Sequence, residues 1–280
     1  MDQVIAFDIG GTNSRIALFE HGKIIWRDEA ITPGQQGPTA MLETMLGLLP
    51  QLEARSAPIV VAIAAQIIDA CVNANNQSIL RGWNNFPLAS VLSERAQRPV
   101  RLINDARAAA WGEYVYGAGR DCEQFLFVTI STGIGAGLVL NGRLHLARNG
   151  YEAELGETLT EHGQMLEDLA SGSALARLAL QNGYASARLF CDAADAGDIQ
   201  ADALYRSGIR EVAKKIADLV VMLGIQKVAV GGGLGLRVGY LARLQDEMKK
   251  FPPTYQCELV AASLGHDAGL YGAAAYTTMR

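Results

Sequence analysis

A pattern of strand, glycine loop, strand, glycine turn and strand opens the chain and begins again at residue 125. In the first copy the loop is Asp8-Ile9-Gly10-Gly11-Thr12 and the turn is His21-Gly22. In the second copy the loop begins at Gly133 and the turn is Asn141-Gly142. Because dipeptides that end in glycine suit two-residue hairpin turns, each copy predicts three strands joined by tight connections. The duplication predicts an α/β protein with two similar lobes around a central cleft.

Helices and further strands follow each copy of the repeat. Apolar residues at helical spacing predict helices over residues 39–55, 88–97, 106–116 and within 164–223, then a C-terminal helix. Short apolar runs predict strands at residues 59–63, 100–103, 228–230 and 258–262. We therefore divide the chain into an N-terminal lobe, residues 1–117, and a C-terminal lobe, residues 118–280, whose last helix could return to the first lobe.

Charge and cysteine usage narrow the partners and the compartment. Lys and Arg number 24 against 29 for Asp and Glu, a net charge of −5, which argues against nucleic acid or an anionic membrane as partner. The N-terminus lacks the basic region of a signal peptide, and no apolar run approaches the roughly 18 residues of a membrane span. Four cysteines lie far apart without a CxxC pair, which argues against disulfides. The sequence predicts a cytoplasmic protein that binds neither nucleic acid nor membrane.

The glycine loops do not match the common nucleotide-binding motifs. The Gly-Lys pair at 22–23 lacks the following Ser or Thr of a P-loop, and the GxGxxG spacing fails at Gly133 and Gly231, where leucine takes the last position. Two interpretations remain. Each loop could contain glycine only to form a tight turn, or its backbone N–H groups could cradle phosphate oxygens, with hydroxyls such as those of Thr12 and Thr132 as further donors. Two such loops in matched hairpins favour the cradle.

Two carboxylates and an amide stand at predicted strand ends. Asp8 lies beside the first glycine loop, where a carboxylate repels phosphate unless a cation lies between them; it therefore indicates Mg²⁺, bound directly or through water, with an Asx turn as the alternative. Asp105 lies between a strand and a helix, either as an N-cap or as a general base that accepts a hydroxyl proton during phosphoryl transfer. Asn104 beside it could orient a sugar hydroxyl.

Five motifs, in this order along the chain, resemble those of the ROK family of sugar kinases. They are Asp8–Thr12, Asn104-Asp105, Ser131-Thr132-Gly133-Ile134-Gly135, Gly231-Gly232-Gly233 and His266–Ala273. Each is weak alone, but five in order are specific, and the resemblance covers nearly the whole chain. Within the family, residues 103–111 and the last motif most resemble the bacterial N-acetylmannosamine kinases.

The resemblance implies a fold, cofactors and a set of contacts. It implies the duplicated actin-like, ribonuclease-H-type fold, and ATP with Mg²⁺ as cofactors. It implies that the nucleoside lies by Gly231, Gly232 and Gly233, and that the phosphates contact Asp8, Gly10, Gly11, Thr12, Thr132, Gly133 and Gly135. Family members are often dimers, so a homodimer is one expectation, although the residues themselves do not decide it.

The resemblance also implies a set of sugar-binding residues. Asn104 and Asp105 hold the sugar, with Asp105 as the base. A family motif G-E-x-G-H reads Ala153-Glu154-Leu155-Gly156-Glu157 here, so Glu154 matches while Ala153 and Glu157 replace glycine and histidine. A second family glutamate matches Glu167. Because Glu157 accepts hydrogen bonds where a histidine could also donate, the hydroxyl pattern that it prefers differs.

A structural zinc site of the family is incomplete in this sequence. Typical members bind zinc with the histidine that Glu157 replaces and with three cysteines before the second glutamate. Between Gly156 and Glu167 this chain has carboxylates and His162 but no thiol. We therefore predict that the protein carries no structural zinc.

Several functions compete. The first is ATP-dependent phosphorylation of the 6-hydroxyl of N-acetylmannosamine, and the nearest alternative is the same chemistry on glucose or N-acetylglucosamine. The family also contains sugar-responsive repressors, but these have an N-terminal DNA-binding domain, whereas Asp8 already belongs to the kinase motif here. A sugar-binding protein without turnover is a further alternative, which the retained Asp105 argues against. Trp83 could line the sugar site or pack in the core.

Overall fold

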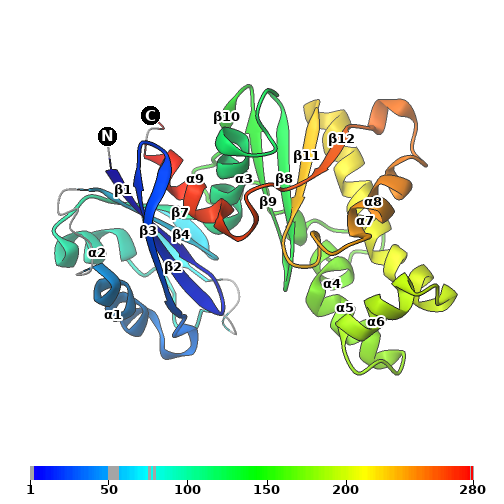
Figure 1. The fold of residues 1–280 in the computed structure, drawn as a ribbon, viewed down its shortest axis with the longest axis horizontal. Helices are drawn as coiled ribbons and strands as arrows, with labels where there is room; N and C mark the ends of the chain where they lie inside the picture. Colours follow the sequence, from blue (N-terminus) through cyan, green and yellow to red (C-terminus); the bar gives the residue numbers. More distant parts are fainter. Residues whose placement is uncertain (1–2, 50–56, 75–76, 78–79, 278, 280) are drawn as a thin grey trace. The chain divides into compact units, whose positions relative to one another are not determined.

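Two five-stranded sheets with the same strand order form the architecture of the chain (Figure 1). The computed structural model describes residues 3–49, 57–74, 77, 80–277 and 279. The first sheet has the order β3-β2-β1-β4-β7, with bounds Lys23–Ile31, Asn13–Glu20, Gln3–Ile9, Ile59–Ile63 and Val100–Asn104. The second has the order β10-β9-β8-β11-β12, with bounds Arg143–Leu144, Ile134–Leu140, Phe125–Ile130, Lys227–Gly231 and Glu258–Ala261.

The predicted hairpins are present in both copies. The turn residues His21 and Gly22 have φ values of 48° and 77°, and Asn141 and Gly142 have values of 53° and 72°. Positive φ at both central residues gives the turn a twist that matches the strands. Within each sheet the central strands are parallel: β1 pairs with β4 and β4 with β7, while β8 pairs with β11 and β11 with β12. The carboxyl ends of these parallel strands therefore meet at one edge of each sheet.

The helices follow the predicted pattern, with one limit. They are α1 (Pro38–Leu48), α2 (Leu88–Ala96), α3 (Asp105–Tyr116), α4 (Leu166–Ala170), α5 (Gly172–Gln181), α6 (Ala187–Asp195), α7 (Ile199–Leu223), α8 (Tyr240–Met248) and α9 (Ala268–Tyr276). The helix predicted over 39–55 matches α1 up to Leu48, and residues 50–56 lie outside the described residues. No helix in the described part of the chain is both long enough and apolar enough to cross a membrane.

The chain divides into two compact units, each with its own apolar core. Unit 1 comprises Met1–Tyr116, Leu144–Glu152 and His266–Arg280, and unit 2 comprises Gly117–Arg143 and Ala153–Gly265. In unit 1, α9 packs directly on α3 and lies close to β1. Glycines permit this approach, because a Cβ at Gly112 would meet the carbonyl oxygen of Ala268 and one at Gly272 would meet that of Ala108. Unit 2 adds helices α4 to α8 around its sheet.

Candidate active site

Parallel strands bring Asp8 and Asn104 to the same edge of the sheet in unit 1. Ile9 pairs with Ile63 on β4, and Ile63 pairs in turn with Asn104 on β7. Helix α3 begins at the next residue, Asp105. Ligands of open α/β sheets bind beyond the carboxyl ends of the strands, and this edge is such a place.

The negative charge of the Asp8 carboxylate is only partly balanced by positive charge nearby. Its side chain is 15% exposed, and burial, followed by the nearby carboxylates of Asp105 and Asp267, raises its pKa to about 7. Arg15 opposes this shift, with Nη1 3.6 Å from Oδ2 of Asp8. Gly269 in the first turn of α9 leaves room for the carboxylate, because a Cβ there would lie 2.9 Å from Cγ of Asp8. No three His, Cys, Asp or Glu side chains of the described residues come close enough together to hold a metal ion by themselves, so a cation at Asp8 would need further ligands from water or phosphate.

The first glycine loop is fixed through its carbonyl oxygens. The hydroxyl of Thr32 donates to the carbonyl of Gly10 at 2.8 Å, and the Thr32 N–H donates to the carbonyl of Thr12 at 2.8 Å. The N–H of Gly10 donates to Asn13 O across the hairpin at 3.1 Å. Gly11 and Thr12 are exposed. The loop is thus held from one side and accessible from the other, as a phosphate cradle requires.

Asn104, and not Asp105, caps helix α3. Its Oδ1 accepts hydrogen bonds from the backbone N–H groups of Ala106 at 3.0 Å and Arg107 at 3.3 Å. Its Nδ2 donates to the carbonyl oxygen of Ala65 at 3.2 Å. The cap of α3 is therefore Asn104 and not Asp105, because the helix begins at Asp105 itself, one residue before the predicted start at residue 106. An amide has two N–H donors, so one bond to Ala65 leaves a second donor for a ligand hydroxyl.

In unit 2, the second glycine loop is anchored to the start of α5. The N–H of Gly172 donates to the carbonyl of Ser131 at 2.7 Å, and the hydroxyl of Ser173 donates to the carbonyl of Thr132 at 2.8 Å. The loop also closes on itself, with the Ser131 N–H donating to Gly133 O at 2.9 Å. Ser131 and Thr132 are exposed. As in the first loop, carbonyl oxygens carry the anchoring bonds.

Glu167 makes a contact that the sequence did not predict. From α4, its Oε2 accepts a hydrogen bond from the backbone N–H of Ile134 at 2.7 Å. A Cβ at Gly133 would collide with that carboxylate, and one at Gly156 would collide with the carbonyl of Ile134. These glycines therefore permit the close approach of three segments. Glu167, which we expected to bind the sugar, therefore uses Oε2 to hold the second glycine loop.

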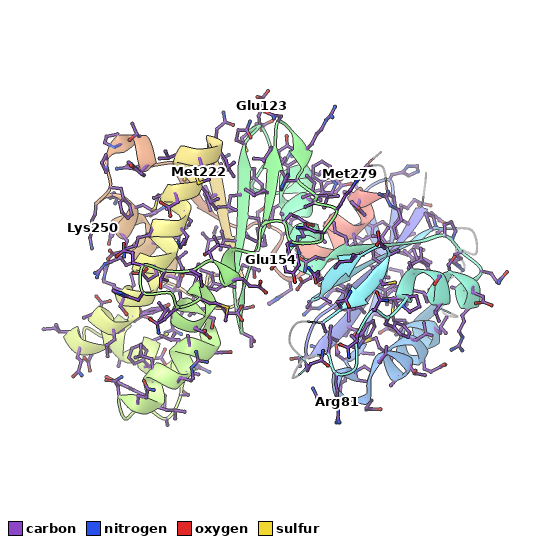
Figure 2. All side chains as sticks on the ribbon, turned by 180° about the vertical axis from the view of Figure 1, so that it is seen from behind. Arg81, Glu123, Glu154, Met222, Lys250 and Met279 are labelled. Carbon is purple, nitrogen blue, oxygen red and sulfur yellow. The ribbon has the colours of Figure 1, made fainter. Side chains whose placement is uncertain are left out.

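The other two glutamates lie on a short turn of unit 2. Glu154, labelled in Figure 2, leads into the 3-10 helix Leu155–Glu157 and is half-buried. Glu157 is exposed. Ala153 has a φ of 57°, in the left-handed region that favours glycine. The motif that this segment resembles has glycine at this position, and the alanine here adopts a conformation that favours glycine.

The Gly231–Gly233 loop lies next to the second glycine loop within unit 2. The N–H groups of Leu234 and Gly235 both donate to the carbonyl of Ile130, at 2.9 and 3.0 Å. A Cβ on Gly231 would press on the Phe127 ring, and one on Gly232, whose φ is 81°, would collide with the Ile130 backbone. Nothing in the described part of the chain lies within 4 Å of a Cβ built on Gly233, which is exposed. Protein packing thus explains two of these glycines but not the third.

Trp83 belongs to the core, and the alternative that it lines a sugar site is wrong. Its side chain is fully buried and makes an edge contact with Phe86, with the ring centroids 5.4 Å apart. Around the expected zinc position, Glu157 and His162 are exposed, and Cys191 is buried in the core of unit 2.

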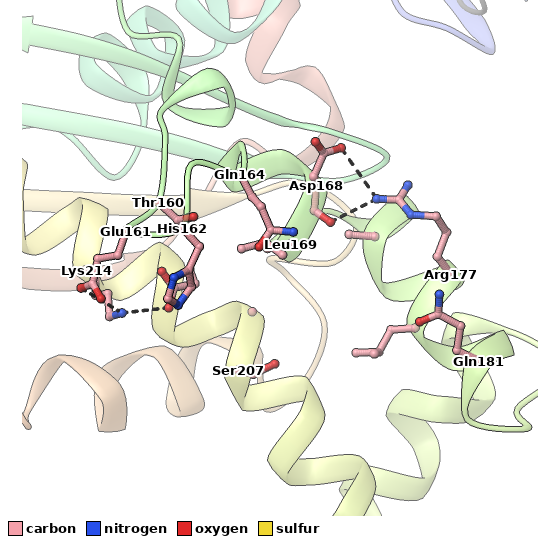
Figure 3. A pocket seen from close by; sticks show the side chains of 14 residues that line it. Thr160, Glu161, His162, Gln164, Asp168, Leu169, Arg177, Gln181, Ser207 and Lys214 are labelled. Atoms are coloured by element: carbon pink, nitrogen blue, oxygen red, sulfur yellow. Dashed lines mark hydrogen bonds and ion pairs between the residues drawn. The ribbon is translucent and has the colours of Figure 1, made fainter.

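A separate pocket of about 630 Å³ lies in unit 2 beside α4, α5 and α7 (Figure 3). Its charged side chains are paired with one another. Arg177 donates to the carbonyl of Asp168 at 3.1 Å, and Lys214 lies 3.5 Å from Glu161 and 3.0 Å from Glu211. The pocket contains none of the predicted site residues, so it is distinct from the loops described above.

Comparison with known proteins gives a consistent result across the whole chain. A sequence model of the ROK family matches residues 4–279. N-acetylmannosamine kinase of Escherichia coli O139:H28 (strain E24377A / ETEC) is 37% identical over 281 residues, which cover 96% of each chain. The ROK hexokinase from Thermus thermophilus superimposes with a TM-score of 0.84 at 29% identity, covering 97% of this chain and 96% of that one.

A ROK family glucokinase from Streptomyces griseus, in complex with glucose and AMPPNP, superimposes with a TM-score of 0.78 at 25% identity, over 98% of both chains. The repeated sheet order and these similarities confirm the predicted duplicated, actin-like α/β fold. Because the family match and the similar sequences both span nearly its full length, this chain belongs to the ROK family.

Proposed function

We propose that the protein is an ATP-dependent sugar kinase that phosphorylates the 6-hydroxyl of N-acetylmannosamine. The observation that carries the proposal is the edge of the unit 1 sheet. There Asp105 stands at the first position of α3, next to Asn104 as the cap, and Asp8 lies two strands away on β1, with β4 between them. The family match and 37% identity to an enzyme named N-acetylmannosamine kinase support the same activity.

In this proposal Asp105 is the general base. Its carboxylate accepts the proton of the sugar 6-hydroxyl as the hydroxyl oxygen attacks the γ-phosphorus. The bond between the γ-phosphorus and the β,γ-bridging oxygen breaks, and ADP leaves. Base catalysis of this kind contributes typically 10²- to 10⁴-fold. Asn104, the residue before it, supplies the cap of the helix.

ATP binding would use both glycine loops and the third glycine segment. Gly10, Gly11 and Thr12 in unit 1, and Thr132, Gly133 and Gly135 in unit 2, would meet the phosphates; Gly231, Gly232 and Gly233 would lie by the nucleoside. The exposed Thr12, Thr132 and Gly233 support this assignment. Asp8 would hold Mg²⁺, directly or through water, and the bound ion would offset the negative charge of the phosphates.

Sugar recognition would involve Asn104, Glu154, Glu157 and Glu167. The spare N–H of Asn104 would donate to a hydroxyl, and the carboxylates would accept from hydroxyl or amide groups of the sugar. Glucose and N-acetylglucosamine are the nearest alternative substrates. A sugar-binding regulator without turnover is the alternative of another class.

An assay of ADP release tests the proposal directly. We expect ADP release in the presence of MgATP and N-acetylmannosamine, with lower kcat/KM for glucose and N-acetylglucosamine. Sugar binding by calorimetry without ADP release would favour the regulator instead.

The remaining expectations concern the setting of the reaction. We propose a cytoplasmic protein whose partners are a small sugar and ATP, rather than nucleic acid or membrane. A homodimer is tested by light scattering coupled to gel filtration, where a mass near that of one chain, 29.9 kDa, would contradict it.

A further inference from the structure

The segment Leu144–Glu152 has little regular structure after β10, yet it belongs to unit 1. Side-chain contacts hold it there. Nε2 of Gln66 donates to the carbonyl of Asn149 at 3.3 Å. Gly150, with a φ of 70°, packs so closely that a Cβ would lie 2.6 Å from the carbonyl oxygen of Ile67. The segment therefore packs on β5 (Gln66–Ile68). This strand begins directly after Ala65, whose carbonyl oxygen accepts the hydrogen bond from the Asn104 amide.

The last residue of the segment makes a buried ion pair with α3. Nε of Arg107 lies 3.1 Å from Oε1 of Glu152, and Nη2 of Arg107 also donates to the backbone carbonyl of Glu152. The two residues are 2% and 8% exposed. One guanidinium thus hydrogen-bonds the backbone carbonyl of Glu152 and forms an ion pair with its carboxylate, although Nε itself makes no hydrogen bond among the residues that the structure describes.

Stability alone does not account for this pair. Removing two charges from water costs about as much as their attraction returns, and well-packed apolar residues often replace a buried pair at no cost in stability. Within the described residues, no group hydrogen-bonds the second carboxylate oxygen of Glu152, Oε2, although it is buried. The pair is costly to bury and incompletely satisfied, so we look for its value in the placement of its neighbours.

We propose that Arg107 and Glu152 are positioning residues for the sugar. Arg107 lies two residues after Asp105 on α3, and Glu152 lies two residues before Glu154. Within unit 1 the pair ties the Leu144–Glu152 segment to the helix that begins with the proposed base, and the chain then continues through the left-handed Ala153 to Glu154. This inference rests on the proposed function of Asp105 and Glu154. Lysine should not replace Arg107 fully, because its ammonium is a compact point charge, whereas the guanidinium reaches the carbonyl and the carboxylate of Glu152 through different nitrogen atoms.

The test is the double variant R107M/E152M, which removes both charges without leaving either one unpaired. Its control is R95M/E43M, which removes an exposed Arg–Glu pair between α2 and α1, away from the proposed site residues. For R107M/E152M we expect a melting temperature close to that of the wild type, a KM for the sugar raised roughly 10- to 100-fold by misplaced binding groups, and an unchanged KM for ATP. R107K should share the sugar defect. The control should leave both KM values unchanged.

Hydrogen exchange gives a readout that does not depend on activity. At equal global stability, residues 144–155 should exchange faster in R107M/E152M than in the wild type. If R107M/E152M had the same sugar KM as the wild type, or the same exchange rates in residues 144–155, the positioning proposal would be overturned. Absence of ADP release from the wild type with every sugar would instead overturn the proposed function, and the exchange experiment would still decide whether the pair holds the segment.

Discussion

Asp8 is the residue whose protonation depends most on its surroundings in the proposed phosphate site. In the unfolded chain an aspartate ionises near pH 3.9, but burial and the neighbouring carboxylates raise the pKa of Asp8 to about 7 in the folded protein. Between these values the folded state binds a proton that the unfolded state does not. The free energy of unfolding should therefore fall as the pH rises from about 4 to 7, unless a cation stabilises the carboxylate.

Replacing Asp8 with Asn should remove this contribution and weaken catalysis. Urea unfolding at several pH values from 5 to 8, without Mg²⁺, should show the stability of the wild type falling relative to that of D8N as the pH rises. Mg²⁺ with nucleotide should reduce the difference by favouring the ionised carboxylate. Turnover of D8N should be lower than that of the wild type. Parallel stability curves would show that the pKa of Asp8 is not raised in the folded protein, and equal magnesium dependence of turnover would show that Asp8 does not hold the ion.

Asp105 is tested by the substitution with Asn. The amide keeps the size of the carboxylate but cannot accept the hydroxyl proton, and the helix keeps its cap because Asn104 supplies it. We expect kcat to fall by roughly 10²- to 10⁴-fold with little change in sugar affinity. D218N, an exposed change on α7, is the control and should be silent. A D105N enzyme with more than about half of wild-type turnover would exclude Asp105 as the base.

At the scale of elements, two neighbouring glycines of the Gly231–Gly233 loop allow a packing requirement to be distinguished from a ligand-binding requirement: within the described residues, Gly232 packs against the protein, and Gly233 does not. Ala at position 232 would meet the Ile130 backbone and would have to adopt a φ of 81°, so G232A should lose about 1–3 kcal/mol of stability. Ala at position 233 has open space, and G233A should unfold within about 0.5 kcal/mol of the wild type.

The effect of these substitutions on ATP binding should not follow their effect on stability. If Gly233 is there to admit the nucleotide, G233A should raise the KM for ATP despite its normal stability. Thermal melts and ATP titrations measure both quantities. Normal ATP affinity in G233A would mean that the loop does not approach the nucleoside at this residue.

Much of the fold could be predicted because its signals are local. The dipeptides His21-Gly22 and Asn141-Gly142 are typical of hairpin turns, and the continuous apolar runs of β4 and β8 are typical of buried strands. The β5–β6 hairpin, Gln66–Ile68 with Cys71–Asn73, was missed, because its turn residues Asp69 and Ala70 have positive φ without any glycine.

The site was harder to predict, because its contacts join distant parts of the sequence. The bond from Ile134 to Glu167 spans 33 positions, and that from Gln66 to Asn149 spans 83. No local pattern signals either contact. The capping of α3 was misassigned for a smaller reason: Asn and Asp are both good caps, and the choice between Asn104 and Asp105 depends on a helix boundary known only to a residue or two.

For the whole molecule, the departure from the family motif predicts a protein without structural zinc. Structural zinc sites are closed, four-coordinate and usually rich in thiolates. Cys191 is buried in the core of unit 2, while Glu157 and His162 are exposed. We expect elemental analysis of the purified protein to find far less than one zinc per chain. About one zinc per chain, retained through dialysis against a chelator, would contradict this and would reopen the assignment of Glu157 to the sugar.

The central claim is that this member of the ROK family phosphorylates an N-acetylhexosamine. The most direct measurement is ADP release from MgATP across a panel of hexoses and N-acetylhexosamines, with phosphorus NMR of the product. We expect the highest kcat/KM for N-acetylmannosamine, a product phosphorylated on the 6-oxygen, and loss of turnover in D105N. A higher kcat/KM for a hexose than for every N-acetylhexosamine, or ADP release no greater than the background for every sugar of the panel, would contradict the proposed function.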